Sequence, residues 1–199
     1  GLYEIEGVAI RGHKKISTPF GDPSDDYLTG EFSAGKVVFL PRHGSRHSIP
    51  PHKINYRANI RGFKELGVER IISVGAVGGI DAAMPPGTIV VLDQIIDMTH
   101  GRHSTFYDGE SGVVHIDFTE PYCPELRNAV IEAGGKAGIS LKKSGTYICS
   151  NGPRLETKAE IGFYSRIGAD VVGMTGMPEA SLAREAEICY AGIAVVTNY

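Results

Sequence analysis

Short apolar runs that alternate with amphipathic stretches constrain the fold of this chain more than any other feature. Such runs are typical of strands buried inside a parallel sheet. Between them, apolar residues recur at helical spacing over residues 54–66, 124–137, 156–167 and 178–188. This alternation predicts an α/β fold in three layers, with a mixed but mostly parallel sheet flanked by helices. The predicted strands are Val37–Leu40, Arg70–Val74, Thr88–Leu92, Asp170–Val172 and Ile193–Thr197.

The predicted helices begin and end at residues that suit those places. A glycine follows each of the first three, at Gly67, Gly138 and Gly168, and Pro178 opens the fourth. Glycine is common just past a helix, and proline suits a first helical turn. Neither an internal repeat nor a linker interrupts the pattern, so we predict one domain over residues 1–199.

Composition excludes two broad classes of partner. The net charge of −3 and the pI of about 6.2 argue against a nucleic-acid-binding protein, which usually carries a basic face. No stretch approaches the roughly 20 apolar residues that a membrane span requires. The first residues, Gly1-Leu2-Tyr3-Glu4, lack the basic start and apolar run of a signal peptide. A cytoplasmic location is therefore the default expectation.

The three cysteines, Cys123, Cys149 and Cys189, lie far apart in the sequence. They match neither a metal-ligand spacing nor a disulfide framework. We therefore expect three buried free thiols.

A long segment from Asp97 to Phe118 is rich in Gly, His, Ser and Thr and has no sustained period. A loop of this length inside a compact domain is usually functional or covers a partner. We expect one of these roles here.

A basic loop follows the first predicted strand. It reads Pro41-Arg42-His43-Gly44-Ser45-Arg46-His47, with two arginines and two histidines in six positions. An arginine presents a planar fork of donors that matches phosphate oxygens. The loop is therefore a candidate anion site, and a solvated basic loop is the alternative. His43 taken by itself would more often be a structural histidine.

Four further ligand-type segments lie at turns beside predicted strands. Small residues over 73–79 expose backbone N–H groups that can cradle an anion, or they form a tight turn. Glu156 stands near a helix start, where it can bind a ligand or merely favour the helix dipole. Thr175 and free N–H groups at another helix start suit phosphate, or Thr175 is a simple cap. Asn198 ends the last strand and is uninformative alone. Together the five segments predict one ligand site at one edge of the sheet.

At these segments the chain resembles the methylthioadenosine phosphorylase branch of the trimeric purine nucleoside phosphorylases. The resemblance is nearest to S-methyl-5′-thioinosine phosphorylases and related 6-oxopurine enzymes, and it runs over essentially the whole chain in the family's order. It rests on Pro41-Arg42-His43-Gly44 with His47, on Asn55-Tyr56-Arg57-Ala58-Asn59-Ile60, on Gly152-Pro153-Arg154-Leu155-Glu156-Thr157 and on Gly173-Met174-Thr175-Gly176-Met177-Pro178-Glu179.

The resemblance implies a nucleoside phosphorylase-like fold and phosphorolytic cleavage of the bond between a purine and its sugar. The products would be a free base and a sugar 1-phosphate. Inorganic phosphate would be a co-substrate, with no metal or organic cofactor, and the assembly would be a homotrimer or a dimer of trimers. Relatives also carry an N-terminal strand with a Gly-Gly-Ser/Thr-Gly phosphate loop and a C-terminal segment. We expect both to be missing from residues 1–199, so the chain would be a fragment.

The resemblance also implies a role for individual residues. The catalytic residues would be Asn198, Glu156 and His43. Phosphate would be held by Arg42, His43, the Gly75-Ala76 backbone and Thr175. The nucleoside would be bound by Met174 at the ribosyl face, Leu155 on the purine, and Glu156 and Asn198 at the base edge. His115 would reach the 5′-substituent pocket of a neighbouring subunit.

Donor and acceptor matching predicts the base. A 6-oxopurine presents O6 as an acceptor and N1–H as a donor, which suit the Asn198 amide and the Glu156 carboxylate. Adenine reverses both, and adenine-preferring relatives carry Asp at the position of Asn198. We therefore expect hypoxanthine or guanine nucleosides as substrates.

Three other interpretations stay open. One is an adenine-preferring methylthioadenosine phosphorylase. A second is a non-catalytic subunit that binds nucleoside or phosphate, and phosphate-dependent release of base would separate it from an enzyme. The third, which has least support, is a doubly wound domain of unrelated function.

Overall fold

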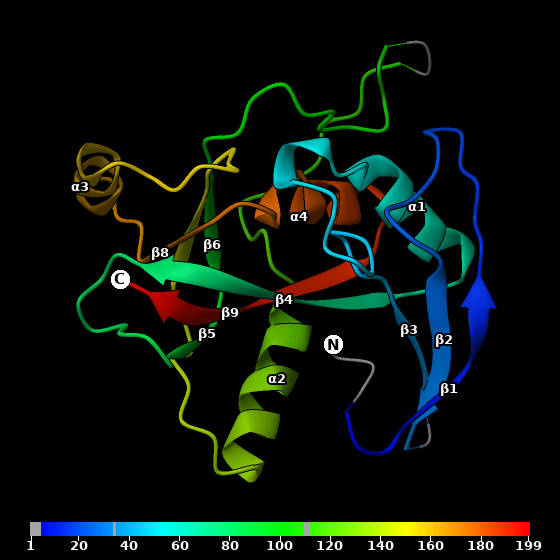
Figure 1. Ribbon diagram of the computed structural model, residues 1–199, viewed down its shortest axis with the longest axis horizontal. Coiled ribbons are helices and arrows are strands. Elements are labelled where there is room, and N and C mark those ends of the chain that lie inside the picture. Colours follow the sequence, from blue (N-terminus) through cyan, green and yellow to red (C-terminus); the bar gives the residue numbers. More distant parts are fainter. Residues whose placement is uncertain (1–4, 34, 110–111) are drawn as a thin grey trace.

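The computed structural model describes residues 5–33, 35–109 and 112–199. These form two sheets and four α-helices, with a short 3₁₀ turn at Pro51–Lys53 (Figure 1). The helices are α1 (Tyr56–Glu65), α2 (Pro124–Lys136), α3 (Lys158–Arg166) and α4 (Gly176–Glu185). The strands are β1 (Val8–Lys14), β2 (Tyr27–Phe32), β3 (Gly35–Phe39), β4 (Arg70–Gly79), β5 (Ile89–Val91), β6 (Gln94–Asp97), β7 (Thr146–Cys149), β8 (Val171–Gly173) and β9 (Cys189–Asn198).

The larger sheet has six strands in the order β5-β9-β4-β8-β7-β6. The pairs β4–β9, β7–β8 and β6–β7 are parallel, whereas β5–β9 and β4–β8 are antiparallel. This sheet confirms the predicted α/β fold with a mixed, mostly parallel sheet. All five predicted runs overlap strands, although the first of them, β3, belongs to the smaller sheet.

Helices cover both faces of the six-stranded sheet. In Figure 1, α2 lies on one face and α1 and α4 lie on the other. Each predicted helix is present, with ends that differ from the prediction by at most three residues. The helix α4 begins at Gly176, two residues before the expected Pro178, and its backbone is non-helical at Met177 and Pro178. The core between the layers consists of buried aliphatic and tyrosine side chains, among them Val90, Val171, Leu182 and Tyr190.

A second sheet of three antiparallel strands, β1-β2-β3, lies beside α1 (Figure 1). Tyr27, at the start of β2, is fully buried and donates a hydrogen bond to the backbone carbonyl of Asn59 at 2.7 Å. Its ring meets Phe63 edge-on at 5.0 Å. A Cβ at Gly62 would come within 2.2 Å of the Tyr27 hydroxyl, so glycine is required there for the strand to approach the helix.

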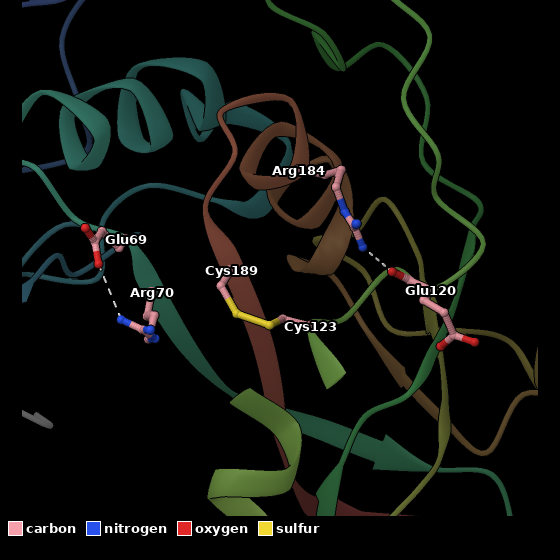
Figure 2. The surroundings of a disulfide bond; sticks show 6 residues. All are labelled: Glu69, Arg70, Glu120, Cys123, Arg184 and Cys189. Atoms are coloured by element: carbon pink, nitrogen blue, oxygen red, sulfur yellow. Dashed lines mark hydrogen bonds and ion pairs between the residues drawn. A yellow bond between two sulfur atoms is a disulfide. The ribbon is translucent and has the colours of Figure 1, made fainter. Parts of the chain in front are cut away.

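The expectation of three free thiols is wrong. Cys123, the residue before α2, forms a disulfide with Cys189, the first residue of β9, and 66 positions separate them (Figure 2). The pairing brings together one residue from each of two distant segments, which a sequence spacing does not reveal. Beside it, Arg184 of α4 donates to the backbone carbonyl of Glu120 (Figure 2). Cys149 is the free cysteine, and it is fully buried.

The longest helix of the described segments is α2, with 13 residues. Over those segments no helix has both the length and the apolar character needed to cross a membrane.

Candidate active site

A single cleft of about 1230 Å³ gathers most of the predicted site residues. It lies where several strands of the large sheet end, and where the loop after β3 meets them. Pockets for small ligands usually measure about 300–1,000 Å³, so the cleft has room for two substrates side by side. Nine predicted residues line it: Arg42, His43, Gly75, Ala76, Leu155, Glu156, Met174, Thr175 and Asn198.

The breadth of the cleft follows from the sheet. Within the described residues, β4 pairs with β9 over most of its length, but with β8 at Gly78 and Gly79 alone. The remaining edge of β4 therefore faces β3 across open space, and residues from both strands line the cleft.

Arg42 is held from several sides at the floor of this cleft. Its Nη1 donates to the Thr175 hydroxyl at 3.1 Å, and its Nη2 donates to the Ser73 hydroxyl at 2.5 Å. Nη2 also lies 3.1 Å from a carboxylate oxygen of Glu179, which in turn accepts from the Tyr190 hydroxyl at 2.8 Å. Three elements therefore fix the guanidinium: β4, the turn after β8, and α4.

The charge of Arg42 is maintained by this arrangement. Burial disfavours the cation, but the Glu179 carboxylate and the nearby tyrosines Tyr190, Tyr147 and Tyr56 together outweigh it, and the pKa of Arg42 is raised. Because the Thr175 hydroxyl accepts from Arg42, its hydrogen remains free to point elsewhere, whereas the Ser73 hydroxyl also bonds to that of Tyr190. The site can thus present a fixed positive charge and the Thr175 hydroxyl to an oxyanion.

His43 is oriented by the loop that carries it. Its Nδ1 lies 2.8 Å from the backbone carbonyl of Ile49, so Nδ1 carries the hydrogen and Nε2 is left for a ligand. Burial, and to a lesser extent the nearby His47 and Arg42, lowers the pKa of His43 despite that hydrogen bond. The imidazole is therefore neutral at pH 7.

The lowered pKa of His43 predicts how stability depends on pH. Below the ordinary His pKa of 6.5 the unfolded chain takes up a proton that the folded chain resists. The free energy of unfolding should therefore fall as the pH drops below about 6.5. We expect His43→Gln to flatten this fall in Tm between pH 7 and pH 5. His103→Gln, at an exposed histidine, is the control and should leave the profile as in the wild type.

The N-terminus of α4 differs from the expectation of free N–H groups. The N–H groups of Thr175 and Gly176 donate to the Tyr147 hydroxyl at 3.2 and 3.3 Å. The N–H of Met177 donates to Cys149 Sγ at 3.3 Å. Tyr147 and Cys149 belong to β7, so side chains of this strand accept the hydrogen bonds of the N–H groups at the start of α4. The contribution of Thr175 to an anion site is its side chain, not these N–H groups.

Glu156 is not a helix cap. The cap of α3 is Thr157, which forms a reciprocal capping box with Glu160. Glu156 instead accepts a hydrogen bond at 2.5 Å from the hydroxyl of Ser150, which is itself buried at the end of β7. Glu156 also lines the cleft. Because Thr157 and Glu160 cap the helix, Glu156 has no role in starting it.

The remaining cleft residues differ in exposure. Leu155 lines the cleft and is 71% exposed. Asn198 is exposed at the end of β9, and its amide oxygen accepts from Thr197 at 3.2 Å. A Cβ added at Gly75 would meet no atom within 4 Å, so this backbone faces the open cleft.

His115 is the one predicted site residue that does not line the cleft. It lies exposed in the segment from Met98 to Phe118, which contains no helix or strand in its described part. Val113 and Val114, its neighbours, are 77% and 44% exposed. Within this chain His115 is not part of the site, and its predicted reach into another subunit stays a prediction.

Comparison with known proteins decides the family. The model of the Phosphorylase superfamily matches residues 4–199. The chain belongs to the Phosphorylase superfamily. This member is 59% identical over 185 residues to the probable S-methyl-5′-thioinosine phosphorylase of Thermodesulfovibrio yellowstonii, covering 92% of this chain and 69% of that protein.

Two further relatives of this phosphorylase-superfamily chain carry other names. It is 53% identical over 205 residues to the 6-oxopurine nucleoside phosphorylase of Pyrococcus furiosus, and 52% identical over 199 residues to the S-methyl-5′-thioadenosine phosphorylase of Thermofilum pendens. Each match covers all of this chain and 76% of the relative. The methylthioadenosine phosphorylase of Schistosoma mansoni with tubercidin superposes with a TM-score of 0.94 at 38% identity, covering 96% of this chain and 75% of that one.

The supporting residues of this superfamily member were not singled out from its sequence. Tyr147 and Tyr190 lie within apolar strands and give no signal of their own, and Ser73 was noted only as one of the small residues over 73–79. Glu179 was quoted in the segment Gly173–Glu179 without a role, although a carboxylate among the small and apolar residues of α4 favours a buried, paired position.

Proposed function

We propose that this chain catalyses the phosphate-dependent cleavage of 6-oxopurine nucleosides. Candidate substrates are S-methyl-5′-thioinosine, inosine and guanosine. The observation that supports the proposal is that one cleft is lined by Arg42, His43 and Thr175 together with Glu156 and Asn198. We propose that the first three bind phosphate and the other two read the base.

The proposed chemistry uses these residues directly. Breaking the N-glycosidic bond leaves a sugar with oxocarbenium character and a purine that carries negative charge. Phosphate held by Arg42 and Thr175 stabilises the sugar cation and then attacks its anomeric carbon. A hydrogen bond from Asn198 to the purine helps the base to leave. The reaction requires inorganic phosphate as second substrate and no metal or organic cofactor.

A four-substrate assay tests the proposal. Inosine, S-methyl-5′-thioinosine, adenosine and S-methyl-5′-thioadenosine are each incubated with and without phosphate, and released base is measured. We expect release to require phosphate and to be faster with both hypoxanthine nucleosides. Faster turnover of both adenine nucleosides would favour the methylthioadenosine phosphorylase alternative, which the Thermofilum pendens relative represents. Binding without any release would favour a non-catalytic subunit.

Asn198 should decide the base. In Asn198→Asp the amide donor to O6 is lost, and the new carboxylate accepts from the adenine amino group. Mispairing a buried polar group costs about 1–3 kcal/mol, so the ratio of kcat/KM for inosine over adenosine should fall roughly 5- to 150-fold. Asn128→Asp on the exposed side of α2 makes the same chemical change far from the cleft and should not alter the ratio. An unchanged ratio in Asn198→Asp would remove this residue from base recognition.

Assembly and location complete the proposal. We propose a homotrimer or a dimer of trimers in which the segment around His115, with exposed Val113 and Val114, packs on a neighbouring subunit. Light scattering of the purified protein would measure the assembly. We also propose a cytoplasmic location. Disulfides such as Cys123–Cys189 are rare in cytosolic proteins, and those of hyperthermophiles are the main exception.

A further inference from the structure

Arg102 is a partly buried cation that the proposed chemistry does not use. It lies in the long segment after β6, and it binds three other parts of the fold. Its Nη1 donates to the carbonyl of Met177 at 2.5 Å and to the Tyr56 hydroxyl at 3.1 Å. Its Nε donates to the side-chain oxygen of Asn151 at 3.2 Å. Its Nη2 donates to the backbone carbonyls of Asn151 and Ser150 at 3.0 and 3.4 Å.

These contacts fix the turn that follows β7. Asn151 is held by Arg102 through both its backbone and its side chain, and the N–H of His100 also donates to that side chain at 3.4 Å. The backbone carbonyl of Ser150 is held by the same guanidinium. The N–H of Ser150 donates to the carbonyl of Gly173 at 2.8 Å. Ser150 is therefore anchored on both sides of its Cα.

The anchored side chain of Ser150 reaches Glu156. Its hydroxyl is buried and donates to one oxygen of Glu156 at 2.5 Å. A carboxylate with one oxygen occupied in this way loses freedom about its side-chain torsions and keeps its other oxygen as an acceptor. Glu156 lines the cleft, so that second oxygen is available to a ligand there.

We propose that Ser150, anchored by Arg102, is a positioning residue for purine recognition. It holds one oxygen of Glu156 so that the other accepts the N1–H of a 6-oxopurine. This inference rests on the proposed function, since it assigns a partner to the base-reading carboxylate. Because Ser150 acts through Glu156, its removal should weaken the use of the nucleoside and leave the use of phosphate unchanged.

A double-mutant cycle on the full-length protein tests this role. Phosphorolysis of inosine is measured for the wild type, Ser150→Ala, Glu156→Gln and the double variant, at saturating phosphate and then with phosphate varied. A hydrogen bond to a charged group of this kind predicts about a tenfold loss of kcat/KM for inosine in Ser150→Ala. The KM for phosphate should stay within about twofold. In the Glu156→Gln background, adding Ser150→Ala should lower kcat/KM for inosine by less than about twofold.

Two further variants separate positioning from general damage. Ser150→Thr keeps the hydroxyl and should recover most of the lost kcat/KM. Ser181→Ala is the matched control, because Ser181 is a partly buried serine whose hydroxyl donates to the backbone carbonyl of Pro178 at 3.0 Å and not to Glu156. It should behave as the wild type.

Each outcome decides a different point. Additive losses in the cycle, or a parallel rise in the KM for phosphate, would show a merely structural role for Ser150 and would overturn the inference. A Glu156→Gln variant with unchanged use of inosine would overturn base recognition by Glu156, and the inference with it. A wild-type protein that releases no base with phosphate would overturn the proposed function itself.

Discussion

Replacing Arg42 by methionine should reduce phosphorolysis by a factor on the order of 10³ or more, since removal of a single preorganised donor from an oxyanion site already costs about 10²–10³. In the proposed phosphate site Arg42 would supply the positive charge, and it donates to the Thr175 and Ser73 hydroxyls. Steady-state kinetics with phosphate varied would measure the loss. A variant that retained the wild-type KM for phosphate would place the anion elsewhere.

The same substitution should also destabilise the fold, because Glu179 would be left as a buried carboxylate without its cation. Breaking a buried ion pair from one side costs about 3–5 kcal/mol. The paired variant Arg42→Met with Glu179→Gln keeps an acceptor for Tyr190 and removes the unpaired charge. It should regain most of the free energy of unfolding without regaining activity. Urea denaturation of the two variants therefore separates the loss of function from the loss of stability.

Loss of the Cys123–Cys189 disulfide should lower the free energy of unfolding by about 4 kcal/mol. The bond closes a loop of 66 residues, and its removal restores conformational entropy to the unfolded chain. For a chain of this size the expected fall in Tm is about 8–16 °C. Thermal unfolding of Cys123→Ser with Cys189→Ser, compared with the wild type, measures the effect.

Reduction supplies the matching control for the disulfide. A reductant should lower the Tm of the wild type toward that of the double variant and should leave the double variant unchanged. Either single substitution should cost nearly as much as both together, because each alone breaks the same bond. A double variant as stable as the wild type would mean that packing around Tyr122 and Tyr190 alone holds these segments together.

The residues that line the cleft could be predicted because they share one simple property. Arg42, Thr175 and Asn198 each come at or just after the carboxyl end of a strand, where ligand-binding residues of α/β folds usually lie. Their strands do not share one edge of one sheet, as was expected, because β3 belongs to the smaller sheet and β8 runs antiparallel to β4, but all three residues line the cleft. The periodicity that located the strands therefore located the ligand-facing residues too. The small antiparallel sheet was missed except for β3, because β1 mixes polar and apolar residues and β2 is interrupted by Gly30.

The parts beneath the cleft could not be predicted, because they depend on tertiary neighbours. Tyr147 reads as one more apolar strand residue, yet its hydroxyl accepts from the N–H groups of Thr175 and Gly176, where α4 begins. Arg102 reads as a polar loop residue, yet it joins segments up to 75 positions away. The pairing of Cys123 with Cys189 likewise depends on the point where β9 starts beside the residue before α2.

The fold contains an intrinsic reporter in Cys149. With the other two cysteines paired, its thiol is the one available to an alkylating reagent, and burial raises its pKa to about 11. Since the thiolate is the reactive form, the native protein should not react with such reagents. Cys149 lies directly under the first turn of α4. The rate at which the unreduced protein is alkylated would therefore measure how often the sheet beneath the cleft opens, and no introduced label is needed.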